Sequence, residues 1–167
     1  MRWFTLAETY LRGEKLEALI FILPLGLVSL LMGAWLLSDV REAFARGVAL
    51  PCLLLGLVLT ATGAGVGFRT PGQLDALTAA VEANPEAARV AELARMEKVN
   101  RNWPIFLGAW ALFGVSGLAL RFASKNDMAQ GVGVALVFYA GAGMLIDGFA
   151  ERRARPYTAA LTAPSTP

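Results

Sequence analysis

The chain alternates between long uncharged apolar segments and shorter charged ones. The apolar segments cover about residues 18–37, 47–68, 103–120 and 128–146. Each is close to the roughly 20 residues that a helix needs to cross the hydrocarbon core of a bilayer. They lack the regular polar positions of a helix with one face in water, and they lack the alternation of a membrane β-strand. The pattern therefore predicts an all-α polytopic protein whose four spans form one membrane domain over residues 1–167.

Composition and the distribution of charge support this prediction and give it a direction. Charged residues make up 17% of the chain, against about 25% in soluble domains. Alternate segments outside the spans carry 11 and 4 of the Lys and Arg residues. Because basic segments are retained in the cytoplasm, we expect both termini and the middle segment on that side. The net charge of +2 gives no broad basic field, so we expect membrane lipid and no nucleic acid as a partner.

The segment before the first span predicts a helix with one apolar side. Its apolar residues are Trp3, Leu6, Tyr10 and Leu11, and charged residues stand beside them. Aromatic side chains of this kind settle at the level of the lipid headgroups. We therefore expect a cytoplasmic interfacial helix that lies on the membrane surface. A helix that docks on a partner protein is the alternative.

The middle segment, residues 70–101, predicts two further cytoplasmic helices. Thr70-Pro71 has the form of a helix start, and Asn84-Pro85 predicts the end of this helix and the start of the next. The second helix carries oppositely charged residues at spacings that favour ion pairs along one helix. These are Glu86/Arg89, Glu92/Arg95 and Glu97/Arg101. The helix is either a solvated continuation of the third span or a recognition surface.

The sequence contains signs of an internal repeat with a shift of 84 residues. Ala-Leu-Thr-Ala at 76–79 recurs at 160–163, and the apolar blocks superpose at the same shift. The predicted units are residues 1–83 and 85–167. Both units begin on the same side of the membrane and contain two spans each. We therefore predict two parallel two-span repeats, related by an axis along the membrane normal.

Glycine is the main candidate for close contacts inside the bilayer, because helices approach each other most closely at small residues. Gly63 and Gly67 have the spacing of the small-residue dimer motif. The sequence does not tell whether such contacts form within one chain or between chains. The positions predicted for helix packing or for a partner interface are Gly56, Gly63, Gly67, Gly114, Gly117 and Gly141.

The four spans contain no Asp, Glu, Lys or Arg, and the chain has no histidine. Asp147 follows the fourth span, and we expect it to pair with Arg69 or with Arg152 at the inner boundary. The single cysteine, Cys52, is expected to pack as a small apolar residue. Nothing in the chain forms a nucleophile with its base or an acidic pair within a span. The sequence therefore predicts no enzyme, no metal site and no cofactor.

Two stretches beside the spans carry a resemblance to known proteins. They are residues 94–103, which enter the third span, and residues 149–154, which leave the fourth. In them the chain resembles a group of small bacterial four-span inner-membrane proteins of unassigned function. The resemblance implies a multi-pass protein of the bacterial inner membrane and no activity. It also marks four possible recognition positions, Arg95, Met96, Asn102 and Trp103.

These observations favour a non-enzymatic helical protein that acts by protein–protein contacts in the bilayer. The partner would be another membrane protein or a second copy of the chain. Such a protein would serve as an accessory subunit of a membrane complex, or as an immunity protein against a membrane-inserting toxin. The alternative is a small homo-oligomeric channel or transporter for an ion or small solute. Scattered hydroxyl groups such as those of Ser29 and Thr60 would line its path.

Overall fold

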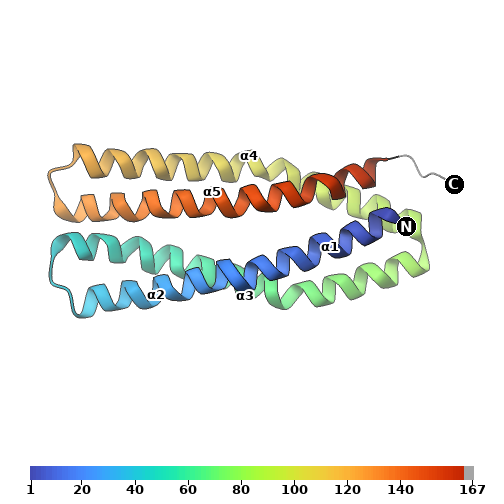
Figure 1. The fold of residues 1–167 in the computed structure, drawn as a ribbon, viewed down its shortest axis with the longest axis horizontal. Coiled ribbons are helices and arrows are strands. Elements are labelled where there is room, and N and C mark those ends of the chain that lie inside the picture. Colours follow the sequence, from blue (N-terminus) through green and yellow to red (C-terminus); the bar gives the residue numbers. More distant parts are fainter. Residues whose placement is uncertain (164–167) are drawn as a thin grey trace.

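The computed structural model describes residues 1–163, which are helical apart from short connections. The elements are α1 (Arg2–Glu17), the π-helical turn η1 (Ala18–Ile22), α2 (Leu23–Ser38), α3 (Ala43–Ala83), α4 (Pro85–Ala123) and α5 (Asp127–Thr162). Because α1, η1 and α2 follow one another without a break, these residues form four long helices (Figure 1). Each is long and apolar enough to cross a membrane. The prediction of an all-α protein with four membrane-length helices is confirmed.

Successive long helices run antiparallel, so that the connections gather at the two ends of an elongated bundle (Figure 1). The loops between α2 and α3 and between α4 and α5 lie at one end, here called the loop end. The amino terminus, the turn between α3 and α4, and the last turns of α5 lie at the other, here called the terminal end. An even number of helices brings both ends of the described chain to the same side.

Asn84 and Asn126 begin the two helices that form the second hairpin. The Asn84 side chain accepts a hydrogen bond from the backbone N–H of Ala87 at 3.1 Å, and Asn126 accepts one from Ala129 at 3.1 Å. Such a cap satisfies a backbone donor that the first helical turn leaves without a partner. The predicted boundary at Asn84-Pro85 is confirmed, because α3 ends at Ala83 and α4 begins at Pro85.

The predicted helix start at Thr70-Pro71 is wrong. α3 continues through both residues from Ala43 to Ala83. The hydroxyl of Thr70 donates to the carbonyl of Val66 at 2.7 Å, one turn back along the same helix. This is the bond that threonine forms in a helix interior, whereas a capping threonine accepts from the following turn. A Thr-Pro pair can therefore stand at the start of a helix or in its interior, and the sequence alone does not tell which.

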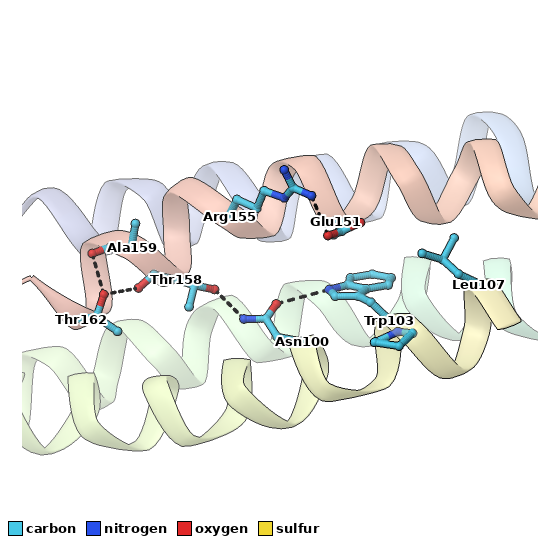
Figure 2. A pocket seen from close by; sticks show the side chains of 9 residues that line it. Asn100, Trp103, Leu107, Glu151, Arg155, Thr158, Ala159 and Thr162 are labelled. Carbon is cyan, nitrogen blue, oxygen red and sulfur yellow. Dashed lines mark hydrogen bonds and ion pairs between the residues drawn. The ribbon is translucent and has the colours of Figure 1, made fainter.

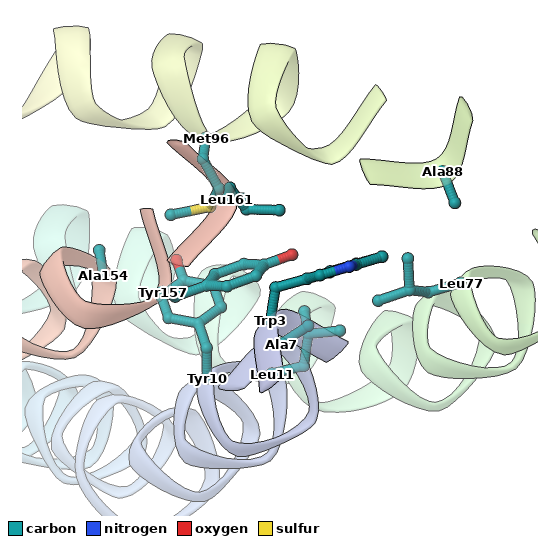
Figure 3. Close-up of a cluster of buried hydrophobic side chains, with 10 residues drawn as sticks. All are labelled: Trp3, Ala7, Tyr10, Leu11, Leu77, Ala88, Met96, Ala154, Tyr157 and Leu161. Carbon is teal, nitrogen blue, oxygen red and sulfur yellow. The ribbon is translucent and has the colours of Figure 1, made fainter. Parts of the chain in front are cut away.

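A buried core at the terminal end joins α1 to the other three long helices. Trp3 and Tyr10 of α1 meet Met96 of α4, and Tyr157 and Leu161 of α5 (Figure 3). The complete set of buried members is Trp3, Ala7, Tyr10, Leu11, Leu77, Ala88, Met96, Ala154, Tyr157 and Leu161. The segments that surround this core, residues 2–17, 70–83, 85–102 and 147–162, are here called the terminal bundle. It is a second four-helix packing, stacked on the end of the apolar segments.

The prediction that α1 is an interfacial helix on the membrane surface is not confirmed. Trp3, Tyr10 and Leu11 are buried inside the protein, and Leu6 packs against the same core. An apolar side on a helix indicates that this side is shielded from water, but it does not tell whether lipid or protein shields it. Here the cover is provided by α3, α4 and α5.

The apolar segments nearer the loop end have little buried core of their own. A small cluster of Cys52, Ala135 and Tyr139 joins α3 to α5, and Cys52 packs there as a buried residue. Most of the large apolar side chains point outward. In the most apolar 18-residue window, 33% of α3 but only 6% of α4 is buried inside the protein. An exterior of this kind suits lipid and is consistent with a membrane protein.

Candidate functional site between helices α4 and α5

A layer of ion pairs lies where the uncharged segments meet the terminal bundle. Arg69 of α3 lies 3.6 Å from Glu14, and Arg153 of α5 pairs with Glu17. Both acidic residues belong to α1, so one arginine from each hairpin holds this helix in place. Arg153 also lies across Gly13, where a side chain would approach its Cδ to 3.1 Å. The layer attaches α1 to the bundle at the point where charged residues first appear.

The predicted pair of Asp147 with Arg69 or Arg152 is absent from residues 1–163. Arg69 contacts Glu14 instead, and Asp147 accepts a hydrogen bond from the indole N–H of Trp110 at 2.6 Å. Asp147 and Arg69 both follow a span, which is why the sequence suggested the pair. However, α5 is turned so that Asp147 faces α4. The rotation of a helix about its axis depends on tertiary packing and is not encoded locally.

The contact between the Trp110 indole and α5 was not predicted from the sequence. The indole lies against Gly143 of α5, where any side chain would collide with the ring. Gly143 and Asp147 are four residues apart and therefore lie on the same side of α5. Gly143 was the available signal, because a small residue lets a neighbouring helix approach closely, but it does not identify the neighbouring residue.

Of the four marked recognition positions, two belong to the interior of the terminal bundle. Met96 is fully buried in its core. Arg95 binds Glu92 through Nε and Nη2, at 3.0 and 2.8 Å from Oε2, and lies 6.0 Å from the centre of the Tyr10 ring. Tyr157 donates a hydrogen bond to the same carboxylate at 2.5 Å. These contacts hold α4 against α1 and α5.

The other charge pairs predicted along α4 are partly present. Glu86 and Arg89 approach to 3.5 Å, whereas Glu97 and Arg101 form no ion pair within residues 1–163.

Burial raises the pKa of Tyr157, and its hydrogen bond to Glu92 raises it further. The side chains of this segment therefore form an internal network around Glu92. Glu86 is exposed, whereas Arg89 is mostly buried and donates a hydrogen bond to the carbonyl of Ala163 at 2.7 Å.

Trp103, the third marked position, lines a groove of about 390 Å³ between α4 and α5 (Figure 2). Asn102, the fourth, is half-buried and is not part of the lining. The groove lies at the boundary between the uncharged segments and the terminal bundle. Its lining residues are Asn100, Trp103, Pro104, Leu107, Glu151, Arg155, Thr158, Ala159 and Thr162.

A short chain of hydrogen bonds fixes the polar wall of this groove. The indole N–H of Trp103 donates to the Asn100 side-chain oxygen at 3.3 Å, and the Asn100 amide donates to the Thr158 hydroxyl at 3.0 Å. Arg155 donates to Glu151 at 2.8 Å, and 71% of the Arg155 side chain remains exposed. The arrangement presents donors and one guanidinium beside an apolar floor. It suits binding of an amphipathic group, and its lining contains no nucleophile paired with a base.

The predicted glycine positions divide into internal and open ones. A Cβ atom would lie 2.7 Å from the Leu23 nitrogen at Gly63 and 2.7 Å from the Gly133 oxygen at Gly117. Gly56 faces backbone, with the Leu30 nitrogen 3.0 Å from an added Cβ atom, whereas Gly67 meets the end of the Leu19 side chain, which can move aside. Gly114 is in ordinary contact with Ala140, and Gly141 has nothing within 4 Å. The close contacts therefore form within one chain, and Gly141 alone of the six is open.

Within residues 1–163, no three His, Cys, Asp or Glu residues gather as metal ligands would. Comparisons of the chain with protein families, with curated proteins and with solved structures found no match.

Proposed function

We propose that this protein is a non-enzymatic helical membrane module that binds another membrane protein, or a second copy of itself, through α4 and α5. The main support is that the rest of the chain buries the four long helices to different extents. α4 is as apolar as a membrane span requires, yet only 6% of its most apolar window is buried by the rest of the chain. A helix left this open provides contact surface for a further helix in the bilayer.

Open glycines on the two helices favour a helical partner over lipid alone. Gly108 of α4 and Gly141 of α5 each leave a position where a Cβ atom would meet nothing within 4 Å. Small residues let a second backbone approach closely, and van der Waals packing is the main source of helix association in lipid. Such contacts would serve an accessory subunit of a membrane complex or an immunity protein against a membrane-inserting toxin.

The proposed site of action is the bacterial inner membrane, with the terminal bundle in the cytoplasm. The support is the division of basic residues, 11 in the alternate segments that include both termini and 4 in the two loops. The terminal bundle would then place its ion pairs and its solvated surface in water, where charged groups are stable.

We also propose that the two hairpins are parallel copies of one unit, and reciprocal contacts support this. Gly33 packs on Leu53 as Gly117 packs on Val137, with both residues shifted by 84. A side chain at Gly47 would strike the Met128 carbonyl. A side chain at Gly131 would strike the Phe44 carbonyl, which is the same contact with the two copies exchanged. Reciprocity of this kind is the mark of a two-fold relation between like units.

The positions of the intramembrane hydroxyl groups favour a binding module over the alternative of a channel or transporter. Ser29 donates to the carbonyl of Leu25 at 2.6 Å within its own helix. Thr60 lies against Gly26 in the contact between α2 and α3, and its buried hydroxyl has no hydrogen-bond partner among the described residues. Ser29 lies against Gly56 in the same contact, so both hydroxyl groups are buried between α2 and α3. A conducting path needs polar groups along a continuous lining.

The proposal is tested by recovery of a partner in mild detergent from the native host, with matched glycine variants. Gly108→Leu and Gly141→Leu add bulk to open positions on α4 and α5, so the chain should fold while partner recovery falls several-fold. Gly65→Leu is the control, because Gly65 is equally open but belongs to α3. Equal recovery with all three variants would exclude this face. Ion-selective flux through liposomes of the purified protein would favour the channel.

A further inference from the structure

We propose that the groove between α4 and α5 binds the phosphate headgroup of an anionic glycerophospholipid, with the phosphate on Arg155 and an acyl chain along Pro104 and Leu107. This inference goes beyond the proposed protein partner and does not depend on it. It requires that the four long helices cross a bilayer, and it rests on the proposed orientation, so that the groove lies at the level of the headgroups on the cytoplasmic side.

The lining of the groove changes from polar to apolar along the bundle axis. Asn100 and Thr158 lie toward the terminal end, Leu107 lies toward the loop end, and Trp103 lies between them (Figure 2). The lining residue Pro104 follows Trp103 in α4. A phospholipid makes the same change from headgroup to acyl chain at the membrane boundary. Indole rings prefer this level, where an apolar ring and an N–H group are both satisfied.

The groove offers hydrogen-bond donors that the protein does not use up. Arg155 bonds Glu151 through one nitrogen, and a guanidinium has five N–H donors, so donors remain on an exposed group. The Asn100 amide gives one N–H to Thr158 and has a second. Arginine binds phosphate oxygens through paired hydrogen bonds, which makes a phosphate the matching acceptor.

The charge around the groove favours an anionic lipid over a zwitterionic one. Glu151 is the acidic lining residue, and Arg155 balances it. Arg101 and Arg152, next in sequence to the lining residues Asn100 and Glu151, are both exposed. Lys98 is exposed as well, whereas Glu97 and Asp147 are the acidic residues within one turn of the same lining residues. The excess positive charge around the groove is therefore one. Basic pockets between spans on the cytoplasmic side attract anionic headgroups in this way.

The apolar surface beside the groove indicates what its occupant must be. Ile105 and Phe106 of α4, next to the lining residue Pro104, are 65% and 47% exposed. When no partner helix is bound, acyl chains of the bilayer cover this surface, and the headgroup of the covering lipid then lies at the level of the groove. The occupant thus needs an acyl chain as well as a phosphate.

The test measures lipid binding to the full-length, delipidated protein by native mass spectrometry. Phosphatidylglycerol and phosphatidylcholine with identical acyl chains are compared, and glycerol 3-phosphate is added as a competitor without acyl chains. The variant is Arg155→Ala. The control is Arg46→Ala, which removes an exposed arginine at the loop end. Circular dichroism checks that both variants keep the helical content of the parent protein.

We expect one phosphatidylglycerol to bind more tightly than phosphatidylcholine, and Arg155→Ala to weaken it about tenfold, as for loss of one charge-assisted contact. Arg46→Ala should change this affinity less than twofold, and millimolar glycerol 3-phosphate should not displace the lipid. Equal affinity for the two lipids, or an equal loss in both variants, would overturn the inference. Displacement by glycerol 3-phosphate would also overturn it, since the site would then take a free phosphate.

Discussion

Replacing Gly63 by alanine is expected to loosen the contact between α2 and α3. A Cβ atom at this position would lie 2.7 Å from the backbone nitrogen of Leu23 and 2.8 Å from its Cα. Carbon atoms in good contact lie about 3.5–4.0 Å apart, so one helix must move outward by roughly 1 Å. Overpacking of this size costs about 1–3 kcal/mol.

Gly65 provides the matched control for this prediction. It lies in the same helix, two residues further on, and a Cβ atom there meets nothing within 4 Å. Alanine at either position gains about 0.5–1 kcal/mol from helix propensity. Gly65→Ala should therefore raise the free energy of unfolding by that amount, and Gly63→Ala should fall about 1–3 kcal/mol below it. Circular dichroism during titration of mixed micelles with SDS measures both values. Equal stability of the two variants would refute the close contact.

Three further predictions concern the terminal bundle. Leu161→Ala should lower the free energy of unfolding by about 2–5 kcal/mol, because Leu161 is 0% exposed. Leu16→Ala, at a position that is 60% exposed, should change it by less than about 0.5 kcal/mol in the same assay. The rings of Tyr10 and Tyr157 lie 5.5 Å apart, so a double-mutant cycle to alanine should give a coupling of about 0.5–1.5 kcal/mol. A coupling of zero would mean that α1 does not dock on α5. Burial raises the pKa of Tyr10 to about 12, with a smaller contribution from the charge of Glu14. The contribution of Tyr10 to the free energy of unfolding should therefore be complete below pH 10 and lost as the pH rises to 12. Ionisation of Tyr10 is followed by absorbance at 295 nm, as the part of the signal that Tyr10→Phe removes, and its midpoint should lie near pH 12.

The features that the sequence predicted correctly depend on short stretches of chain. Each span is recognised from the length of an uncharged segment, without knowledge of its neighbours. The boundary at Asn84-Pro85 depends on a cap within one turn, and the structure contains that cap. One of the two interpretations of the helix after Asn84-Pro85 was a continuation of the third span, and α4 runs without a break from Pro85 to Ala123. The unbroken passage of α3 through Thr70-Pro71 was not predicted.

Other features depend on how the helices are rotated, and the sequence could not supply them. The glycines of the spans indicated close approach, yet Gly63 and Gly141 differ only in which way their helices face. The same holds for Asp147, whose partner is Trp110 of the facing helix. In the groove, Trp103 was marked from sequence, whereas Thr158 lies 55 residues further along the chain and joins the site only by packing.

The most direct test of the central claim is thiol labelling of intact spheroplasts with an impermeant reagent. Cysteines at Asp39 and Lys125 report on the two loops of the loop end, and one at Glu86 reports on the terminal bundle. Buried Cys52 is replaced by alanine in every variant. We expect the cysteines at Asp39 and Lys125 to be labelled in intact spheroplasts, and Glu86→Cys to be labelled only after the membrane is opened. Labelling of Glu86→Cys in intact spheroplasts would contradict the orientation, and labelling of only one loop would contradict four spans.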